Sequence, residues 1–229
     1  MKKVYLGNRQ LTTLATREEG GGGGNDELAK SLIDRSITSV DIPNGVTKIG
    51  QYAFCKCESL SSVTIPNIVT SIGDRAFSYC SRLSSITIPI GLTSIGESTF
   101  QSCESLTSVT IPNTVTRINN SAFYRCYSLS SIDIPSSVTS ISSYAFSNCN
   151  SLSSITIPNS VTTIGNSAFY NSNSLSSITI ESTTKLTYNT NAFQNIASNA
   201  VLRVPSNLVD AYKADSKWTN AFGGGIVAI

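Results

Sequence analysis

The sequence contains no histidine, and charged residues make up only 13% of its 229 positions. Histidine is the commonest general base in enzymes and the commonest side-chain ligand of metal ions. The paired carboxylates of Glu18 and Glu19 stand beside a glycine run, which cannot hold them in a fixed geometry. We therefore expect no enzyme activity, no catalytic residues, no cofactor and no metal site.

Strong charge and long apolar runs are also missing. A formal net charge of +2 is too small to select nucleic acid as a partner. No apolar run is long enough to cross a bilayer, so we expect no membrane insertion. Met1–Gln10 opens with lysines as a signal peptide does, but Gly7, Asn8 and Arg9 interrupt the apolar stretch that should follow. We expect no export by the usual signal route, and the compartment stays open.

What the sequence does contain is a fixed period of 23 residues, which is typical of proteins built from stacked coils. In the repeat L-x-x-I-x-I-P-x-x-V-x-x-I-x-x-x-A-F-x-x-C, the I-x-I piece alternates as a strand does, with its isoleucines facing inward. The proline ends that strand, and the A-F-x-x-C piece is expected to turn or bend. The periodic residues are Pro43, Pro66, Pro89, Pro112, Pro135 and Pro158, and Phe54, Phe77, Phe100, Phe123, Phe146 and Phe169.

The period divides the chain into four parts. Residues 1–24 form an N-terminal segment that ends in a glycine tether, and residues 25–36 form an N-terminal cap with a helix from Glu27 to Arg35. Residues 37–199 form seven coils, and residues 200–229 form a C-terminal cap. The predicted fold is a mostly β solenoid of right-handed coils, with a parallel sheet on one face and short helices at both ends.

The C-terminal cap is predicted in more detail. Residues 200–205 have the pattern of one more strand, and Ser206 is expected to cap a helix that runs to Lys213. Trp218 and Phe222 are expected to cover the last coil, and residues 226–229 to form a terminal strand.

Five cysteines follow the same period and should stack one coil apart, roughly the ~4.8 Å spacing of neighbouring strands. That separation is close to what a disulfide can bridge. Packing as small buried hydrophobic groups is nevertheless favoured over disulfides and over metal binding, because the position follows the inward Ala-Phe pair and Ser172 takes the sixth place. Cys55 lies outside this column and is expected to be exposed. The column consists of Cys57, Cys80, Cys103, Cys126 and Cys149.

The outward strand positions repeat Ser and Thr, as in Ser85 and Thr87 or Ser108 and Thr110. A regular hydroxyl array resembles an ice-binding surface. Plain solvation by residues that favour strands is the simpler interpretation, and we prefer it because Asp41 and Asp133 interrupt the pattern.

The segment around Ala-Phe differs from coil to coil, whereas the strand hardly changes. Tyr124, Arg125 and Tyr127 cluster in one coil, and Tyr144 and Tyr170 stand one and two coils further on. Tyrosine and arginine are favoured at binding hot spots. We predict that these five residues form a partner-binding ridge; the alternative is neutral drift on a solvated edge.

The repeat L-x-x-I-T-I-P-x-x-V-T-x-I-x-x-x-A-F-x-x-C closely resembles the BspA-type leucine-rich repeat of bacterial surface proteins. The likeness covers about residues 37–198, and Val204-Pro205 followed by residues 208–213 is similar to that family's usual C-terminal end. The resemblance implies a leucine-rich repeat solenoid without catalytic residues. It also implies a protein partner, such as a host or matrix protein, and a place at the cell surface or outside the cell.

Two functions are compatible with these features. The first is a non-enzymatic protein-binding or adhesion module that works through an extended solenoid surface. The second is a structural or display component, such as a phage- or prophage-derived particle part, which the glycine tether and the expected lack of a signal peptide favour.

Overall fold

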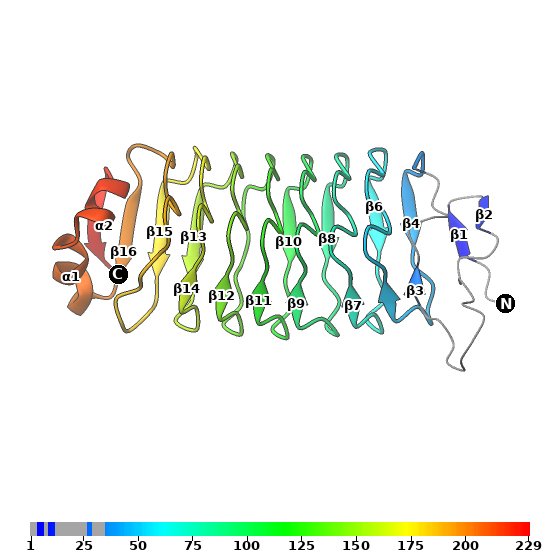
Figure 1. Ribbon diagram of the computed structural model, residues 1–229, viewed down its shortest axis with the longest axis horizontal. Helices are drawn as coiled ribbons and strands as arrows, with labels where there is room; N and C mark the ends of the chain where they lie inside the picture. The colour runs from blue at the N-terminus through cyan, green and yellow to red at the C-terminus, as the bar shows by residue number, and fades with distance from the viewer. Residues whose placement is uncertain (1–3, 7–8, 12–26, 29–34) are drawn as a thin grey trace.

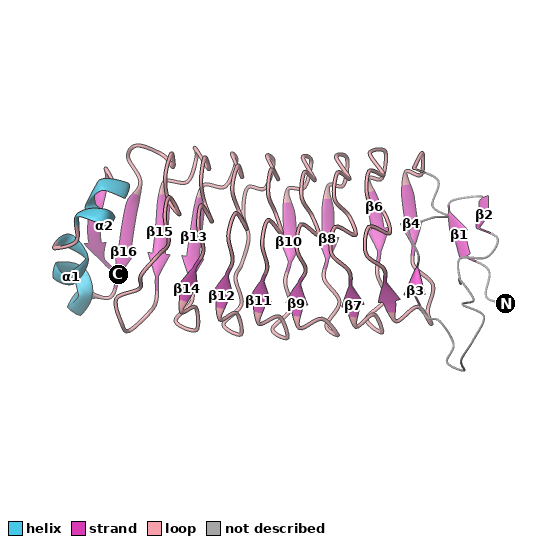
Figure 2. Cartoon of the chain, viewed as in Figure 1, coloured by secondary structure: helices cyan, strands magenta, loops and turns pink. Residues whose placement is uncertain are grey.

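Each repeat folds into one coil, and the coils stack in a row from the N-terminal end to a helical C-terminal cap (Figure 1). The computed structural model describes residues 4–6, 9–11, 27–28 and 35–229. Within that part the predicted fold is confirmed: short parallel strands form the body and the few helices lie in the C-terminal cap (Figure 2).

The I-x-I piece of most repeats forms a strand on one long face, which we call the front face. Its strands pair in parallel and in register, so that Val109 lies beside Ile86 and Ile155 beside Ile178. The inward Ile or Val is buried in most strands, and the flanking Ser and Thr point outward. The front strands are β4 (Ser39–Asp41), β6 (Ser62–Thr64), β8 (Ser85–Thr87), β10 (Ser108–Thr110), β13 (Ser154–Ile157), β15 (Ser177–Ile180), β16 (Val201–Val204) and β17 (Gly225–Ala228).

The front sheet is divided into three parts rather than continuous. The paired groups are β4 with β6, β8 with β10, and β13 through β17. Residues 131–134 follow the path of a front strand, with Ile132 buried and Asp133 exposed as predicted, but they form no strand. Asp133 does not explain this interruption, because Asp41 holds the same repeat position inside β4.

A second face carries short parallel strands that the sequence pattern did not predict. Each has two residues, with an inward, buried Ile wherever the side chains are described, and two residues are too few to show a strand period. These strands pair from β3 to β7 and from β9 to β14. They are β3 (Glu27–Leu28), β5 (Lys48–Ile49), β7 (Ser71–Ile72), β9 (Ser94–Ile95), β11 (Arg117–Ile118), β12 (Ser140–Ile141) and β14 (Thr163–Ile164).

The core is a column of stacked phenylalanine rings between these faces. Neighbouring rings from Phe54 to Phe193 are stacked, with their centroids 5.1–5.7 Å apart and their planes nearly parallel. Phe193 keeps its place in the column although it follows Phe169 by 24 residues instead of 23. Most of the inward Leu, Val, Ile and Ala side chains are buried around the column, and a few, such as Val46 and Val63, are partly buried against it.

The N-terminal cap differs from the prediction. Glu27–Leu28 is strand β3, which pairs in parallel with β5, so the predicted helix from Glu27 is wrong at its start. Pairing with the open edge of the second sheet satisfies the backbone groups that a helix would have bonded internally. Arg35 lies in a turn, and residues 29–34 and the glycine tether lie outside the described residues. Further toward the N-terminus, β1 (Val4–Leu6) and β2 (Arg9–Leu11) pair antiparallel.

The C-terminal cap contains the predicted strands as β16 and β17, but its helices differ from the prediction. Residues Ser206–Leu208 form a 3-10 turn, η2, before helix α1 (Val209–Lys213), and no side chain caps either one, so the expected Ser206 cap is wrong. A second helix, α2 (Ser216–Ala221), was not predicted; the Asp215 side chain caps it by accepting from the Lys217 N–H. Trp218 and Phe222 are buried against Phe193, as predicted.

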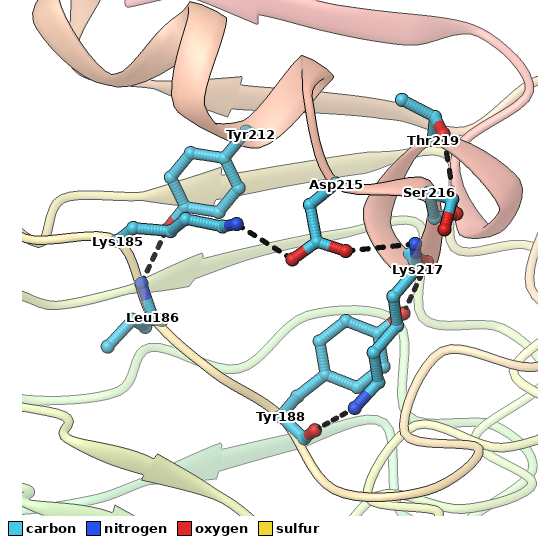
Figure 3. A network of polar contacts seen from close by, with 8 residues as sticks. All are labelled: Lys185, Leu186, Tyr188, Tyr212, Asp215, Ser216, Lys217 and Thr219. Atoms are coloured by element: carbon cyan, nitrogen blue, oxygen red, sulfur yellow. Dashed lines mark hydrogen bonds and ion pairs between the residues drawn. The ribbon is translucent and has the colours of Figure 1, made fainter.

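The cap docks on the loop that holds the extra residue of the last coil (Figure 3). Lys185 pairs with Asp215 at 2.7 Å, and the Leu186 N–H donates to the Tyr212 hydroxyl at 2.9 Å. The Tyr188 hydroxyl donates to the Lys217 carbonyl at 2.7 Å, while the Lys217 ammonium donates back to the Tyr188 carbonyl. These bonds fix α2 beside the last coil.

Replacing Phe123 with Ala should lower the free energy of unfolding by about 3–5 kcal/mol, because it leaves a cavity in the middle of the ring column. Chemical denaturation of the two proteins measures the difference. Tyr144→Ala removes an exposed aromatic ring and serves as the control, with a much smaller change expected. Equal midpoints for Phe123→Ala and the parent would contradict the column.

Candidate functional site

The A-F-x-x-C pieces form a continuous edge of turns along the stack, which we call the turn edge. Each coil contributes a five-residue stretch such as Ser121–Arg125, whose first and last residues have a left-handed backbone, with φ of 55° and 60° in this coil. Left-handed residues other than glycine are uncommon. None of the periodic left-handed positions is glycine: they are Tyr52, Lys56, Arg75, Tyr79, Ser98, Ser102, Ser121, Arg125, Tyr144, Asn148, Ser167, Asn171, Asn191 and Asn195.

Backbone hydrogen bonds between coils hold these turns in place. Alternate N–H groups donate to the next coil, as Ser121 does to Ser143, Phe123 to Ala145 and Arg125 to Ser147, each at 2.9 Å. The same three bonds recur from the coil of Tyr52 up to the coil of Ser167. The bonds offset the cost of the left-handed backbone, and they fix the direction in which each side chain leaves the edge.

The structure brings together three of the predicted ridge residues. The Arg125 guanidinium lies 5.1 Å from the centroid of the Tyr124 ring, in a cation–π arrangement. Tyr124 above all, and then Tyr127, raise the pKa of Arg125 through their electrostatic interaction with it, so its charge is secure. Tyr144 and Tyr170 lie on the next two coils, and neither forms a hydrogen bond or cation–π contact with Arg125.

Two neighbouring groups on the turn edge were missed in the sequence. Tyr79 is 41% exposed and also raises the pKa of Arg125, which stands at the same repeat position two coils later. The second group centres on Arg75, which donates to the Tyr52 hydroxyl at 3.1 Å and pairs with Glu97 at 2.6 Å. Comparing the repeats places Tyr52 and Arg75 at one position and Tyr79 at the position of Arg125, but only the contacts between coils show which residues group together.

The cysteine column is core packing, as predicted. All six cysteines are free thiols, and the five periodic ones are buried. Cys103 Sγ donates to the Phe77 carbonyl at 3.2 Å, and Ser172 Oγ makes the equivalent bond to Phe146 at 2.9 Å. Burial raises the pKa of the Cys80, Cys103, Cys126 and Cys149 thiols well above the ordinary value. Cys55 is half-buried rather than exposed.

The front face carries the predicted hydroxyls in register, with Ser85 beside Ser108 and Thr87 beside Thr110. The pairing of the strands is interrupted twice, between β6 and β8 and again at residues 131–134. Asp41 and Asp133 are exposed among the hydroxyls, and plain solvation is the simpler interpretation of this array.

The described ranges offer neither a metal site nor a membrane-spanning helix. No cluster of three or more His, Cys, Asp or Glu residues that could hold a metal ion occurs there. Within the same ranges, every helix is too short or too polar to cross a membrane.

Comparison with known families identifies the family to which the chain belongs. The family model for the BspA type leucine rich repeat region, in six copies, matches residues 30–150 and 116–214. These matches cover most of the chain, so it is a leucine-rich repeat protein of bacterial type. The chain belongs to the BspA-type leucine-rich repeat family. Among curated proteins, none matches it.

Solved structures of bacterial leucine-rich repeat proteins are similar to it. A leucine-rich repeat protein from Bacteroides ovatus is 27% identical, with a TM-score of 0.55 over 84% of this chain and 62% of the other. A leucine-rich repeat protein from Eubacterium ventriosum is 30% identical, with a TM-score of 0.49 over 66% of this chain and 47% of the other. The chain therefore spans less than two thirds of the length of either relative.

The burial of the cysteines predicts their chemistry. In the native protein, a thiol reagent at mildly alkaline pH should label Cys55 first and leave the five column cysteines unreacted, because the thiolate is the reactive form. Mass spectrometry of the labelled protein identifies the sites. Unfolding in denaturant should release all six. Rapid native labelling of Cys103 would contradict its place in the core.

Replacing Cys103 with Ser should be mild, because a serine already makes the same bond at position 172. The expected loss in the free energy of unfolding is below about 2 kcal/mol. Reducing agent should leave the melting temperature of the parent unchanged, since no disulfide is present to break. A drop in melting temperature on reduction would contradict the free thiols.

Proposed function

We propose that this chain is a non-enzymatic protein-binding module whose binding surface is the turn edge around Tyr124, Arg125, Tyr127, Tyr144 and Tyr170. The observation that carries the proposal is the exposed Arg125, which lies over the Tyr124 ring in a cation–π arrangement, with Tyr127 two residues further along the same coil. Leucine-rich repeat proteins generally mediate protein interactions, which supports this class of function.

The backbone of the turn edge supports a binding role for these side chains. Arg125 and Tyr144 occupy left-handed positions that glycine would adopt with less strain. Their backbone N–H groups are bonded to the next coil, so the side chains leave a rigid edge. A surface that is ordered before binding loses less entropy when the partner arrives.

The finer proposal is adhesion, with a host or matrix protein as the partner and the cell surface or extracellular space as the location. Its support is the membership of the BspA-type repeat family. The partner should be acidic or rich in carbonyl oxygens where it meets Arg125, since the guanidinium has no acidic partner of its own among the described residues.

A double variant tests the surface. Tyr124→Ala combined with Arg125→Ala should raise the Kd for the captured partner by about tenfold or more, because we expect the pair to be a hot spot. Affinity capture from host and bacterial extracts finds the partner, and titration with the purified partner measures both proteins.

Arg117→Ala is the matched control, because it removes one exposed charge from β11 on the second face. It should keep full affinity. Equal affinity of the double variant and the parent would overturn the proposed surface. A stably folded parent that captures no specific protein would favour the structural or display function instead.

A further inference from the structure

The hydrogen bonds of the turn edge run in one direction. In each coil, the N–H groups at the first, third and fifth positions of the stretch donate toward the C-terminal end of the stack. Ser167, Phe169 and Asn171 form the last such set, and they donate to Thr190, Ala192 and Gln194. The turn edge is therefore polar, with N–H groups pointing to the C-terminal end.

The last coil leaves its own set of donors open. The corresponding groups are the N–H groups of Asn191, Phe193 and Asn195, and none donates to an acceptor in the described part of the chain. Buried or half-buried N–H groups without a partner are rare in folded proteins. Phe193 is 2% exposed, so its N–H group can be reached only from the space between the last coil and the cap.

A cavity lies beside these donors. Its volume is about 680 Å³, within the range of ligand sites, and its walls come from the last coil and from the cap. Asn191, Phe193 and Asn195 line it on the coil side, and Lys217 and Asn220 of α2 line it on the cap side. The counterparts of these three N–H groups point toward the next coil in every earlier coil, and beyond the last coil the cap takes the place of a next coil.

Lys217 gives this cavity a positive charge. Its ammonium lies 4.2 Å from the centroid of the Tyr188 ring and donates to the Tyr188 carbonyl, which holds it at the cavity wall (Figure 3). Asp215, the acidic group nearby, is paired with Lys185 at 2.7 Å, and that bond is the main reason that its pKa is lowered. Lys217 itself forms no ion pair with any carboxylate of the described residues.

We propose that this cavity binds a short acidic peptide segment in an extended form. Its backbone carbonyls would accept from Asn191, Phe193 and Asn195 and so add one more rung to the turn edge, while a carboxylate side chain pairs with Lys217. A peptide fits better than a single small anion, because the donors are spread over five residues and need several acceptors.

The test is a titration of the isotope-labelled full chain with the peptide Ac-Glu-Ala-Glu-Ala-Glu-NH2, followed by NMR. The amide proton signals of Asn191, Phe193 and Asn195 should move downfield and saturate as their hydrogen bonds form. Those of Ser167, Phe169 and Asn171, which are already bonded, should stay in place. The peptide Ac-Gln-Ala-Gln-Ala-Gln-NH2 should bind about tenfold more weakly, because it has no carboxylate to pair with Lys217.

Lys217→Ala should weaken binding of the acidic peptide by about tenfold. Lys213→Ala is the matched control, because it removes an exposed lysine of α1 outside the cavity, and it should bind as the parent does. Tyr124→Ala with Arg125→Ala should also bind normally, so this site and the proposed binding surface can fail separately.

The titration of the parent protein alone can overturn the proposal, without any variant. Unmoved signals of Asn191, Phe193 and Asn195 at saturating peptide would overturn the proposal, as would equal binding of the two peptides. A shift of the same signals with protein concentration alone would show that a second copy, not a peptide, occupies the cavity.

Discussion

The stack depends on backbone hydrogen bonds that join each coil to the next, and these bonds connect the same repeat positions from coil to coil. Along the turn edge the N–H of a residue meets the carbonyl 22 positions later in most coils, as Tyr52 meets Asp74 and Phe123 meets Ala145. At the last coil, which holds an extra residue, the distance is 23 positions, as Phe169 meets Ala192. The same register stacks the phenylalanine rings and places the thiols of Cys80, Cys103, Cys126 and Cys149 against the phenylalanine carbonyl of the preceding coil. One inserted residue shifts this register, so an insertion is tolerated only in a loop that returns the chain to its place.

That constraint explains how charge and aromatic groups can stand on left-handed residues. The N–H groups of Tyr144 and Arg125 are satisfied by the next coil, and their side chains need only space and solvent. The repeats keep Phe in this segment and, in most coils, Ala and Cys, while their outward positions differ from coil to coil. A variable surface on an invariant frame is the arrangement that repeat proteins use to bind partners.

The sequence predicts those structural features that depend only on the pattern of residues within one repeat. Its period, its inward Ile and its Ala-Phe-x-x-Cys turns predict the solenoid, and the buried column that holds Cys103 follows from them. The pairing of Glu27–Leu28 with β5 escaped prediction, because a strand at an open sheet edge has no periodic pattern of its own. The short second-face strands escaped for the same reason.

The candidate site was predicted only in part, because its contacts join different coils. Tyr124 and Arg125 are neighbours in sequence and were found together. Arg75 reaches Tyr52 and Glu97, which are 23 and 22 residues away, so linear reading misses this group. Tyr79 was missed likewise, because its nearness to Arg125 spans two coils.

The ends of the stack pose a different problem from its middle, since each face must be closed separately. The front face is closed by β16 and β17, which continue the sheet past the last coil. The second face is closed by the bridge between Ile164 and Tyr188. After β16 the chain turns into η2, α1 and α2 instead of a further turn, so the turn edge receives no closing rung. The cap covers this end with Lys217 and Asn220 across a cavity, and three N–H groups stay open there. The cap thus covers the aromatic core with Trp218 and Phe222. It does not supply the backbone carbonyls that the next coil supplies elsewhere along the turn edge.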